Sequence, residues 1–258
     1  WHIRAHPSGS PHKMNTSIAE TIERSIEAAA DPEDAFQLSR FFQTGPGQYG
    51  EGDMFLGVRV PKTREIIKPF IHQATHDDIR RLTASSYHEI RLAGFLCLVG
   101  QYGRAASGRN SDPKKAQDAV ALYIELIDRG NNWDLVDMVA PKILGDRIVR
   151  FPETHNILLS LAESGNLWRE RVSIVSTWTV IRSGRFDLTL CLADRFLTHP
   201  HHLMHKAVGW MLREVGKRHE PLLLRYLDEN ATKMPRTALR YAIERLTPDI
   251  RRHYLTAK

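Results

Sequence analysis

The sequence predicts an all-α protein, and three observations support this fold class. Apolar residues recur at three- and four-residue spacing through the middle and end of the chain, as on amphipathic helices. Glycine, proline and asparagine separate these runs, as expected at helix ends. No two alternating, β-branched segments are joined by a hairpin turn. The periodic runs cover residues 116–127, 135–144, 157–161, 172–181, 188–196, 207–215 and 222–227.

A repeat underlies these helices. Four helical segments share a pattern in which a charged residue precedes an aliphatic residue and then small or apolar residues, at Arg91, Asp137, Arg171 and Lys206. These positions are 46, 34 and 35 residues apart. Periods of about 35–47 residues with two helices per unit are typical of α-solenoids of HEAT or armadillo type. We therefore expect a curved solenoid of HEAT-like repeats that presents the four charged residues in register on its concave face.

Length and composition exclude several classes of protein. The chain has 258 residues, of which 42% are hydrophobic, and no apolar run approaches the ~20 residues of a membrane span. Cys97 and Cys191 are the only cysteines, which favours a reduced, cytoplasmic protein without a disulfide framework or zinc ribbon. Residues 1–13 precede Met14 and are expected to be leader residues outside the fold, which leaves one domain over residues 14–258.

Charge and tryptophan accompany the repeat. The net charge of +6 favours a polyanionic partner if the basic residues share one face. Trp133, Trp168 and Trp210 each lie within about one helical turn of a repeat position. A concave, basic surface that carries aromatic residues matches the charge and curvature of duplex nucleic acid.

The alternative is that the tryptophans belong to the core and the charges to solvated helix faces. We expect burial for Trp168 and Trp178, and exposure for Trp133 and Trp210, whose helix faces also carry polar residues. Trp133 and Asp137 are four residues apart, so their side chains lie on one helix face. An aromatic ring beside an anion suits a flat ligand that is positively charged or electron-poor.

Three other motifs do not support a site. Gly45 to Gly50 fits G-x-G-x-x-G, but a helical segment precedes it, so a flexible connecting loop is favoured over a dinucleotide site. His88-Glu89 lacks the second histidine of H-E-x-x-H, because position 92 is leucine. The histidines between His199 and His205 fit a polar turn between helices, so no metal is expected there.

Several ordered motifs resemble the AlkD-type DNA alkylation-repair glycosylases. They are FLGVRVP at 55–61, NWDLVD at 132–137, the segment 141–146, LWRER at 167–171 and KAVGWMLRE at 206–214. The resemblance extends from about residue 31 to 254. It implies a HEAT-like superhelix that holds duplex DNA and excises N3- and N7-alkylated purines without a metal or cofactor. It also implies that Asp137 is the catalytic carboxylate, that Trp133 and Trp210 flank it, and that Arg171 completes the cleft.

The implied chemistry is consistent with these residue types. Alkylation at N7 of guanine or N3 of adenine leaves the base positively charged and therefore a good leaving group. Asp137 would stabilise the oxocarbenium-like sugar and orient the attacking water, and Arg171 would keep that carboxylate ionised. Because an open groove offers few walls to grip an extruded base, we expect no base flipping, and bulky cationic adducts should also be substrates.

The other basic residues are candidates for phosphate contacts on a duplex bound by a monomer. They are Lys62, Arg64, Arg91, Lys206, Arg213 and Lys217, with Arg240 added from its position near the C-terminus. The alternative is a non-catalytic HEAT scaffold that binds unusual DNA structures. A module that binds protein is disfavoured, since its concave face would be acidic or apolar.

Overall fold

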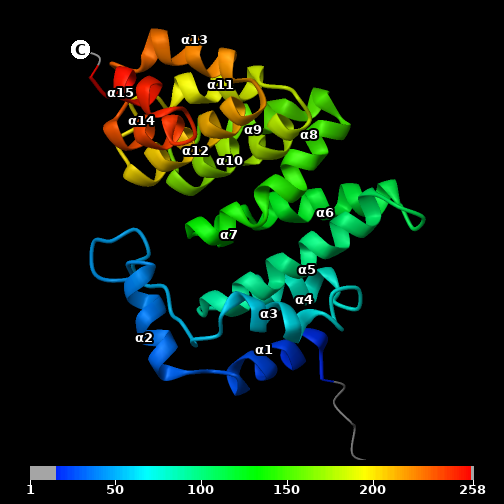
Figure 1. Ribbon diagram of the computed structural model, residues 1–258. Coiled ribbons are helices and arrows are strands. Elements are labelled where there is room, and N and C mark those ends of the chain that lie inside the picture. Colours follow the sequence, from blue (N-terminus) through cyan, green and yellow to red (C-terminus); the bar gives the residue numbers. More distant parts are fainter. Residues whose placement is uncertain (1–15, 257–258) are drawn as a thin grey trace, which may run out of the picture.

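The computed structural model describes residues 16–256, and these form helices joined by loops (Figure 1). Within this range the only β-type pairing is an isolated bridge between Met54 and Tyr87. The prediction of an all-α fold is therefore confirmed. The leader predicted over residues 1–13 lies outside the described residues. None of the described helices is long and apolar enough to cross a membrane.

The helices follow one another with short connections, except between α2 and α3. They are α1 (Ile18–Ala28), α2 (Pro32–Phe41), α3 (Val60–Ile67), α4 (His76–Thr83), α5 (His88–Ala106), α6 (Pro113–Leu126), η1 (Ile127–Arg129), α7 (Trp133–Asp137), η2 (Pro141–Gly145), α8 (Asp146–Arg150), η3 (Pro152–His155), α9 (Asn156–Ala162), α10 (Leu167–Arg182), α11 (Asp187–Arg195), α12 (His202–Arg218), α13 (Glu220–Asn230), α14 (Arg236–Ile243) and α15 (Pro248–Thr256). Of the short elements, η1 and η3 are 3₁₀ helices and η2 is a π-helix.

The helices pack as a solenoid of two rows. In the inner row, α5 contacts η2, α10 packs on both α7 and η2, and α12 packs between α10 and α14. In the outer row, α4, α6, α9, α11 and α13 each pack against an inner helix. The array of helices curves in Figure 1, so that the start of α7 lies between the end of α2 and the part of the solenoid that contains α12.

The four repeat positions fall on successive inner helices. Arg91 is the fourth residue of α5, whereas Asp137, Arg171 and Lys206 are each the fifth residue of α7, α10 and α12. Small residues allow the inner helices to approach closely, as the repeat pattern implies. At Gly209, for example, an added Cβ would lie 2.5 Å from the carbonyl oxygen of Ala238 in α14.

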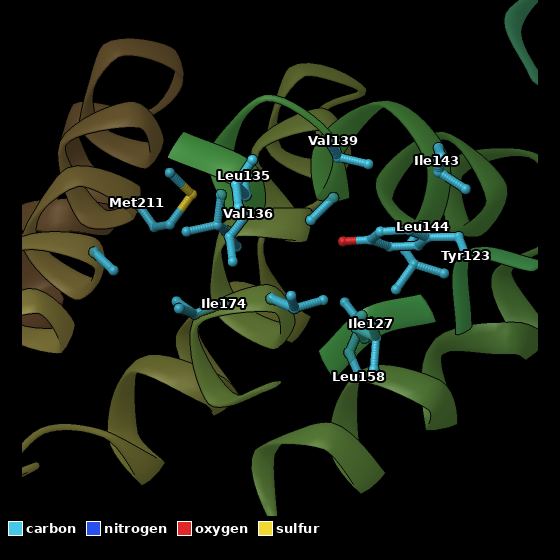
Figure 2. Close-up of a cluster of buried hydrophobic side chains, with 14 of the residues drawn as sticks. Tyr123, Ile127, Leu135, Val136, Val139, Ile143, Leu144, Leu158, Ile174 and Met211 are labelled. Carbon is cyan, nitrogen blue, oxygen red and sulfur yellow. The ribbon is translucent and has the colours of Figure 1, made fainter. Parts of the chain in front are cut away.

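A proline interrupts the inner row just after Asp137. Pro141 has no N–H to give the Asp137 carbonyl, and the chain continues as the π-helix η2 before it returns to α-helix in α8. The Thr179 hydroxyl on α10 donates to the Pro141 carbonyl over 2.6 Å and so ties η2 to the next repeat. Leu135 and Val136 are buried in the core (Figure 2) and fix the opposite face of α7.

The long connection between α2 and α3 is held by the first turn of α5. The buried carboxylate of Glu89 accepts backbone N–H groups from Leu56, Gly57 and Val58 at 2.8–3.2 Å. Gly57 has φ +86°, and a Cβ there would lie 2.0 Å from the Asp31 carbonyl oxygen, so only glycine fits. In the His88-Glu89 pair, Glu89 therefore anchors the loop between α2 and α3.

Candidate functional site

Asp137 and Arg171 form a bidentate ion pair between two repeats. The Nε and Nη2 groups of Arg171 donate to the two carboxylate oxygens over 2.9 and 2.8 Å. The third arm, Nη1, donates to the Leu203 carbonyl at the start of α12 over 2.6 Å. The Asp137 side chain keeps 16% of its surface exposed, whereas Arg171 keeps 6%. Arg171 therefore fixes the carboxylate and leaves part of it accessible.

Opposing effects act on the pKa of Asp137. Burial raises the pKa of Asp137, and the charge and hydrogen bonds of Arg171 oppose that rise. The neighbouring carboxylate of Asp134 adds a further upward contribution to the pKa. A carboxylate held in this way is a poorly solvated anion, which interacts strongly with a positive charge brought next to it.

A largely apolar cavity of about 410 Å³ opens beside Asp137. Phe42 stacks on Trp133 at 5.2 Å between ring centroids, and Phe41 meets the same indole edge-on at 5.9 Å. Phe41 remains 63% exposed, so the aromatic surface continues to the rim. The sequence predicts an open groove with few walls, but aromatic residues form a wall along this part of the cleft. The lining residues are Leu38, Phe41, Phe42, Phe55, Val58, Arg59, Val60, Pro61, His88, Glu89, Leu92, Trp133, Asp134, Asp137 and Met138.

A buried charged cluster packs against Phe42, which forms the aromatic wall of the cavity together with Phe41 and Trp133. The His88 imidazole bonds to Asp53 through Nδ1 and to Asp134 through Nε2, both over 2.8 Å. Phe55 stacks on the same imidazole at 4.6 Å. Burial lowers the pKa of His88, but the two carboxylates outweigh this and raise it to about 9. His88 is therefore an imidazolium at neutral pH and links the loop before α3 to α7.

The same cluster takes in Arg91, one of the predicted phosphate contacts. Its guanidinium is buried and donates to Asp53 over 2.5 Å and to Asn131 over 3.1 Å. The backbone carbonyls of Ser85 and Ser86 accept further hydrogen bonds from it. Arg91 does not face the solvent, and this position removes it from the candidate phosphate contacts. Sequence alone missed the burial because the partner Asp53 lies 38 residues away.

A family model described as DNA alkylation repair enzyme matches residues 22–246. The chain belongs to this family. A solved structure described as a predicted DNA alkylation repair enzyme from Enterococcus faecalis is similar, with a TM-score of 0.66 at 17% sequence identity. The match covers 85% of this chain and 97% of that one, and at this identity it shows a shared fold. No curated protein matches the sequence.

The tryptophans of this family member are less sharply divided than the sequence predicts. Trp210 and Trp133 are both partly buried. Trp210 packs at the edge of the core, whereas Trp133 packs against Phe41 at the end of α2 and Phe42 just after it. Trp168 and Trp178 were expected in the core, but both are only partly buried. Trp178 lies under the Arg182 guanidinium at 4.7 Å, which explains its position at the surface.

The predicted basic residues separate into two groups. Arg64 and Lys206 form no salt bridge among residues 16–256. Lys62, Arg213 and Lys217 already have carboxylate partners, in the pairs Lys62–Glu65, Arg213–Glu244 and Lys217–Glu214. Arg240 is exposed on α14 and also forms no salt bridge among the described residues. Arg64, Lys206 and Arg240 are therefore the predicted cations with the most charge to offer a phosphate.

Sequence reasoning missed Lys142 and Tyr49. Lys142 is exposed on η2, and partial desolvation of its amine together with the nearby charge of Arg64 lowers its pKa. Arg64 itself reaches Met138 at the cavity, with Nη2 3.9 Å from the sulfur. The proximity of two like charges next to the cavity is a signal that only the fold provides. Tyr49 comes from the glycine-rich loop, which the sequence predicts as a flexible connector.

The histidines near Pro200 have other partners. His199 Nε2 contacts Glu170 over 2.9 Å, and the His201 side chain accepts the Leu203 N–H at the start of α12. Within residues 16–256, no group of three or more histidine, cysteine or acidic side chains is arranged to hold a metal ion. This cluster caps α12 and thereby supports the carbonyl that Arg171 contacts.

The charged cluster predicts a pH-dependent stability. Because the pKa of His88 is raised to about 9, its stabilising charge is fully present below its ordinary pKa near 6.5 and lost as the pH rises through 9. The loss should reach roughly 3 kcal/mol in the free energy of unfolding. Denaturant melts at pH 6.5 to 9.5 would measure it. His88→Gln should remove this pH dependence and the exposed control His72→Gln should retain it; equal slopes in both variants would contradict the assignment.

Proposed function

We propose that this member of the DNA alkylation repair enzyme family is a monofunctional glycosylase. It hydrolyses the N-glycosidic bond of N3- and N7-alkylated purines in duplex DNA and works as a monomer. The observation that carries the proposal is the Asp137 carboxylate, fixed by Arg171 and partly exposed at the wall of an aromatic cavity. A buried anion beside aromatic faces matches a substrate whose base is cationic and whose sugar becomes cationic during the reaction.

The reaction requires little from the protein at the leaving group. As the bond between C1′ and the base nitrogen breaks, its electron pair neutralises the positive charge of the alkylated base. The sugar becomes oxocarbenium-like, and a water oxygen then bonds to C1′ and gives up a proton. Asp137 stabilises the developing charge on the sugar and accepts or directs that proton.

The bidentate pair is compatible with this role. Each carboxylate oxygen has two lone-pair sites, and Arg171 uses one on each oxygen. The remaining sites can face the sugar and the attacking water. Since Arg171 is also bonded to the Leu203 carbonyl, it holds the carboxylate orientation through the reaction.

The aromatic wall supplies the affinity for the lesion. The π faces of Trp133 and the exposed Phe41 attract a cationic base more strongly than a neutral one. Trp210 on α12, which is partly buried at the edge of the core, would add a further aromatic face. Recognition in this scheme comes from the charge of the lesion, with few hydrogen bonds to base edges.

Phosphate contacts come first from the cations that have no carboxylate partner. Arg64 reaches Met138 at the cavity and lies close to Lys142, whereas Lys206 lies two repeat positions beyond Asp137 on α12. Arg240 is a further exposed cation on α14. Lys62, Arg213 and Lys217 would have to exchange a glutamate for a phosphate, which reduces their net contribution. These cations would bind the phosphates of the DNA backbone, and such contacts do not distinguish one base from another.

The proposal predicts that Asp137→Asn spares DNA binding and abolishes excision. The amide has nearly the same shape but lacks the negative charge that stabilises the sugar. Single-turnover release of free 7-methylguanine and 3-methyladenine from alkylated duplex measures the effect. The control is Asp118→Asn, which changes an exposed carboxylate on α6 and should release base at the wild-type rate.

Normal release by Asp137→Asn would contradict the mechanism. Binding without any release by the wild-type protein would favour the non-catalytic scaffold instead.

A second prediction concerns the salt dependence of DNA binding. Arg64→Ala, Lys142→Ala or Lys206→Ala should each reduce the slope of log K against log salt by about 0.9, because one phosphate contact is lost. Lys217→Ala should change the slope less, since Glu214 already neutralises that amine. Fluorescence anisotropy with an undamaged duplex between 50 and 200 mM salt, a range of about fourfold, would measure these slopes. Equal slopes for all four variants would refute this division of the cations.

A further inference from the structure

Four histidines lie between the end of α11 and the first turn of α12, and three of them bond to the backbone through a ring nitrogen. Nδ1 of His199 accepts the His201 N–H over 3.0 Å. Nδ1 of His201 accepts the Leu203 N–H over 3.1 Å, and Nε2 of His205 contacts the His199 carbonyl. Within residues 16–256, the fourth histidine, His202, has no hydrogen-bond partner at either ring nitrogen.

The His202 ring is exposed, but aromatic contacts fix its position. It stacks on the His201 ring, with 4.7 Å between the centroids and 21° between the planes. Tyr49, from the loop between α2 and α3, contacts it at 6.0 Å and meets Trp168 of α10 edge-on at 6.2 Å. His202 is therefore held in place while both of its ring nitrogens remain available to a ligand.

The loop that carries Tyr49 lies beside the start of α7. The side chains of Gln48 and Glu51 each accept a backbone N–H of the loop over 2.9 Å and so fix its conformation. An added Cβ at Gly50 would lie 3.4 Å from the side-chain amide of Asn132, which caps α7. The contacts of Tyr49 therefore connect the surroundings of α7 with the first turn of α12.

His202 also adjoins the Asp137–Arg171 pair. It directly precedes Leu203, whose carbonyl accepts the third arm of the Arg171 guanidinium over 2.6 Å. The same guanidinium thus fixes both the Asp137 carboxylate and the first turn of α12. A ligand bound at His202 would lie next to the candidate site.

Lys206 shares a face of α12 with His202. It lies four residues after His202, and Trp210 follows after another four, so the three side chains form one stripe along the helix. Within residues 16–256, neither His202 nor Lys206 forms a salt bridge, and the carboxylate of Glu170 on α10 is bonded to His199. This stripe therefore carries basic groups whose natural partner is an anion from outside the protein.

The groups that face His202 are cationic or neutral. Its own helix contributes Lys206 and His205, the loop contributes the phenol of Tyr49, and Arg171 of α10 contacts the next residue. Burial, together with the charges of Lys206 and His205, lowers the pKa of His202 below its ordinary value near 6.5. The ring is thus largely neutral at physiological pH in the free protein. An anion next to both His202 and Lys206 would offset this repulsion and favour the imidazolium.

We propose that His202 and Lys206 together bind a phosphate of the DNA backbone beside the Asp137–Arg171 pair, and that His202 takes up a proton as the phosphate binds. In the neutral ring one nitrogen already carries a hydrogen, and a proton from solvent adds to the other. The imidazolium then gives the phosphate a charge-assisted hydrogen bond. The inference rests on the proposed function, because it requires a duplex along this face of α12.

The proposal predicts that affinity for DNA falls as the pH rises. The phosphate raises the pKa of His202 in the complex, so between the free and bound pKa values binding takes up one proton. The association constant should then fall by up to about tenfold per pH unit in that window. Fluorescence anisotropy with an undamaged duplex between about pH 5.5 and pH 8 measures this dependence. His202→Gln should bind more weakly at the acid end and lose it, whereas His202→Lys should bind tightly throughout.

The matched control is His72→Gln, which changes an exposed histidine between α3 and α4 and should keep the wild-type pH dependence. In the wild-type protein, the Cε1–H proton resonance of His202, assigned with His202→Gln, should titrate at higher pH when the duplex is bound.

A wild-type pH dependence in His202→Gln, or an unchanged titration of the His202 resonance, would overturn the proposal for His202. The glycosylase function is judged separately by release of 7-methylguanine from alkylated duplex. If the wild-type protein binds no duplex at any of these pH values, both proposals fail.

Discussion

The contact between Arg171 and Asp137 is the interaction on which the rest of the site depends. One guanidinium joins three inner helices, because it holds the carboxylate of α7 with two arms and the first turn of α12 with the third. Withdrawing both charges from water costs on the order of several kcal/mol per ion, and a buried pair repays this only with excellent geometry. The burial of Arg171 is therefore better explained by the orientation that it gives the Asp137 carboxylate than by a contribution to the stability of the fold.

A second charged cluster gives the site its aromatic wall. His88 lies between Asp53 and Asp134, so the last part of the α2–α3 loop and the first turn of α7 are bonded to the same imidazolium. Phe42 and Phe55 pack on that imidazolium, and Trp133 packs on Phe42. The wall beside Asp137 is therefore built from a segment about 90 residues earlier in the chain, and its position depends on charges that are balanced inside the protein.

Local pattern was enough to predict the helices in the middle and end of the chain, the repeat and the face that Trp133 shares with Asp137. The repeat register also predicted that Arg171 approaches Asp137, because each is the fifth residue of successive inner helices. The fate of each cation could not be predicted, since it depends on partners brought close by folding, such as Glu244 for Arg213. The loop that carries Tyr49 was likewise missed, because side-chain hydrogen bonds within a glycine-rich segment leave no periodic signal.

The central claim is that an ionised Asp137, held by Arg171, stabilises the reacting sugar. The most direct test is the pH dependence of single-turnover excision in the wild-type protein, Arg171→Lys and Arg171→Gln, after subtraction of release by Asp137→Asn. Burial raises the pKa of Asp137, so wild-type excision should decline on the acid side as the carboxylate is protonated. Loss of the Arg171 charge in Arg171→Gln should move that decline to higher pH, and Arg171→Lys should fall between the two. An acid limb that is absent, or that stays at the same pH in all three proteins, would contradict the mechanism.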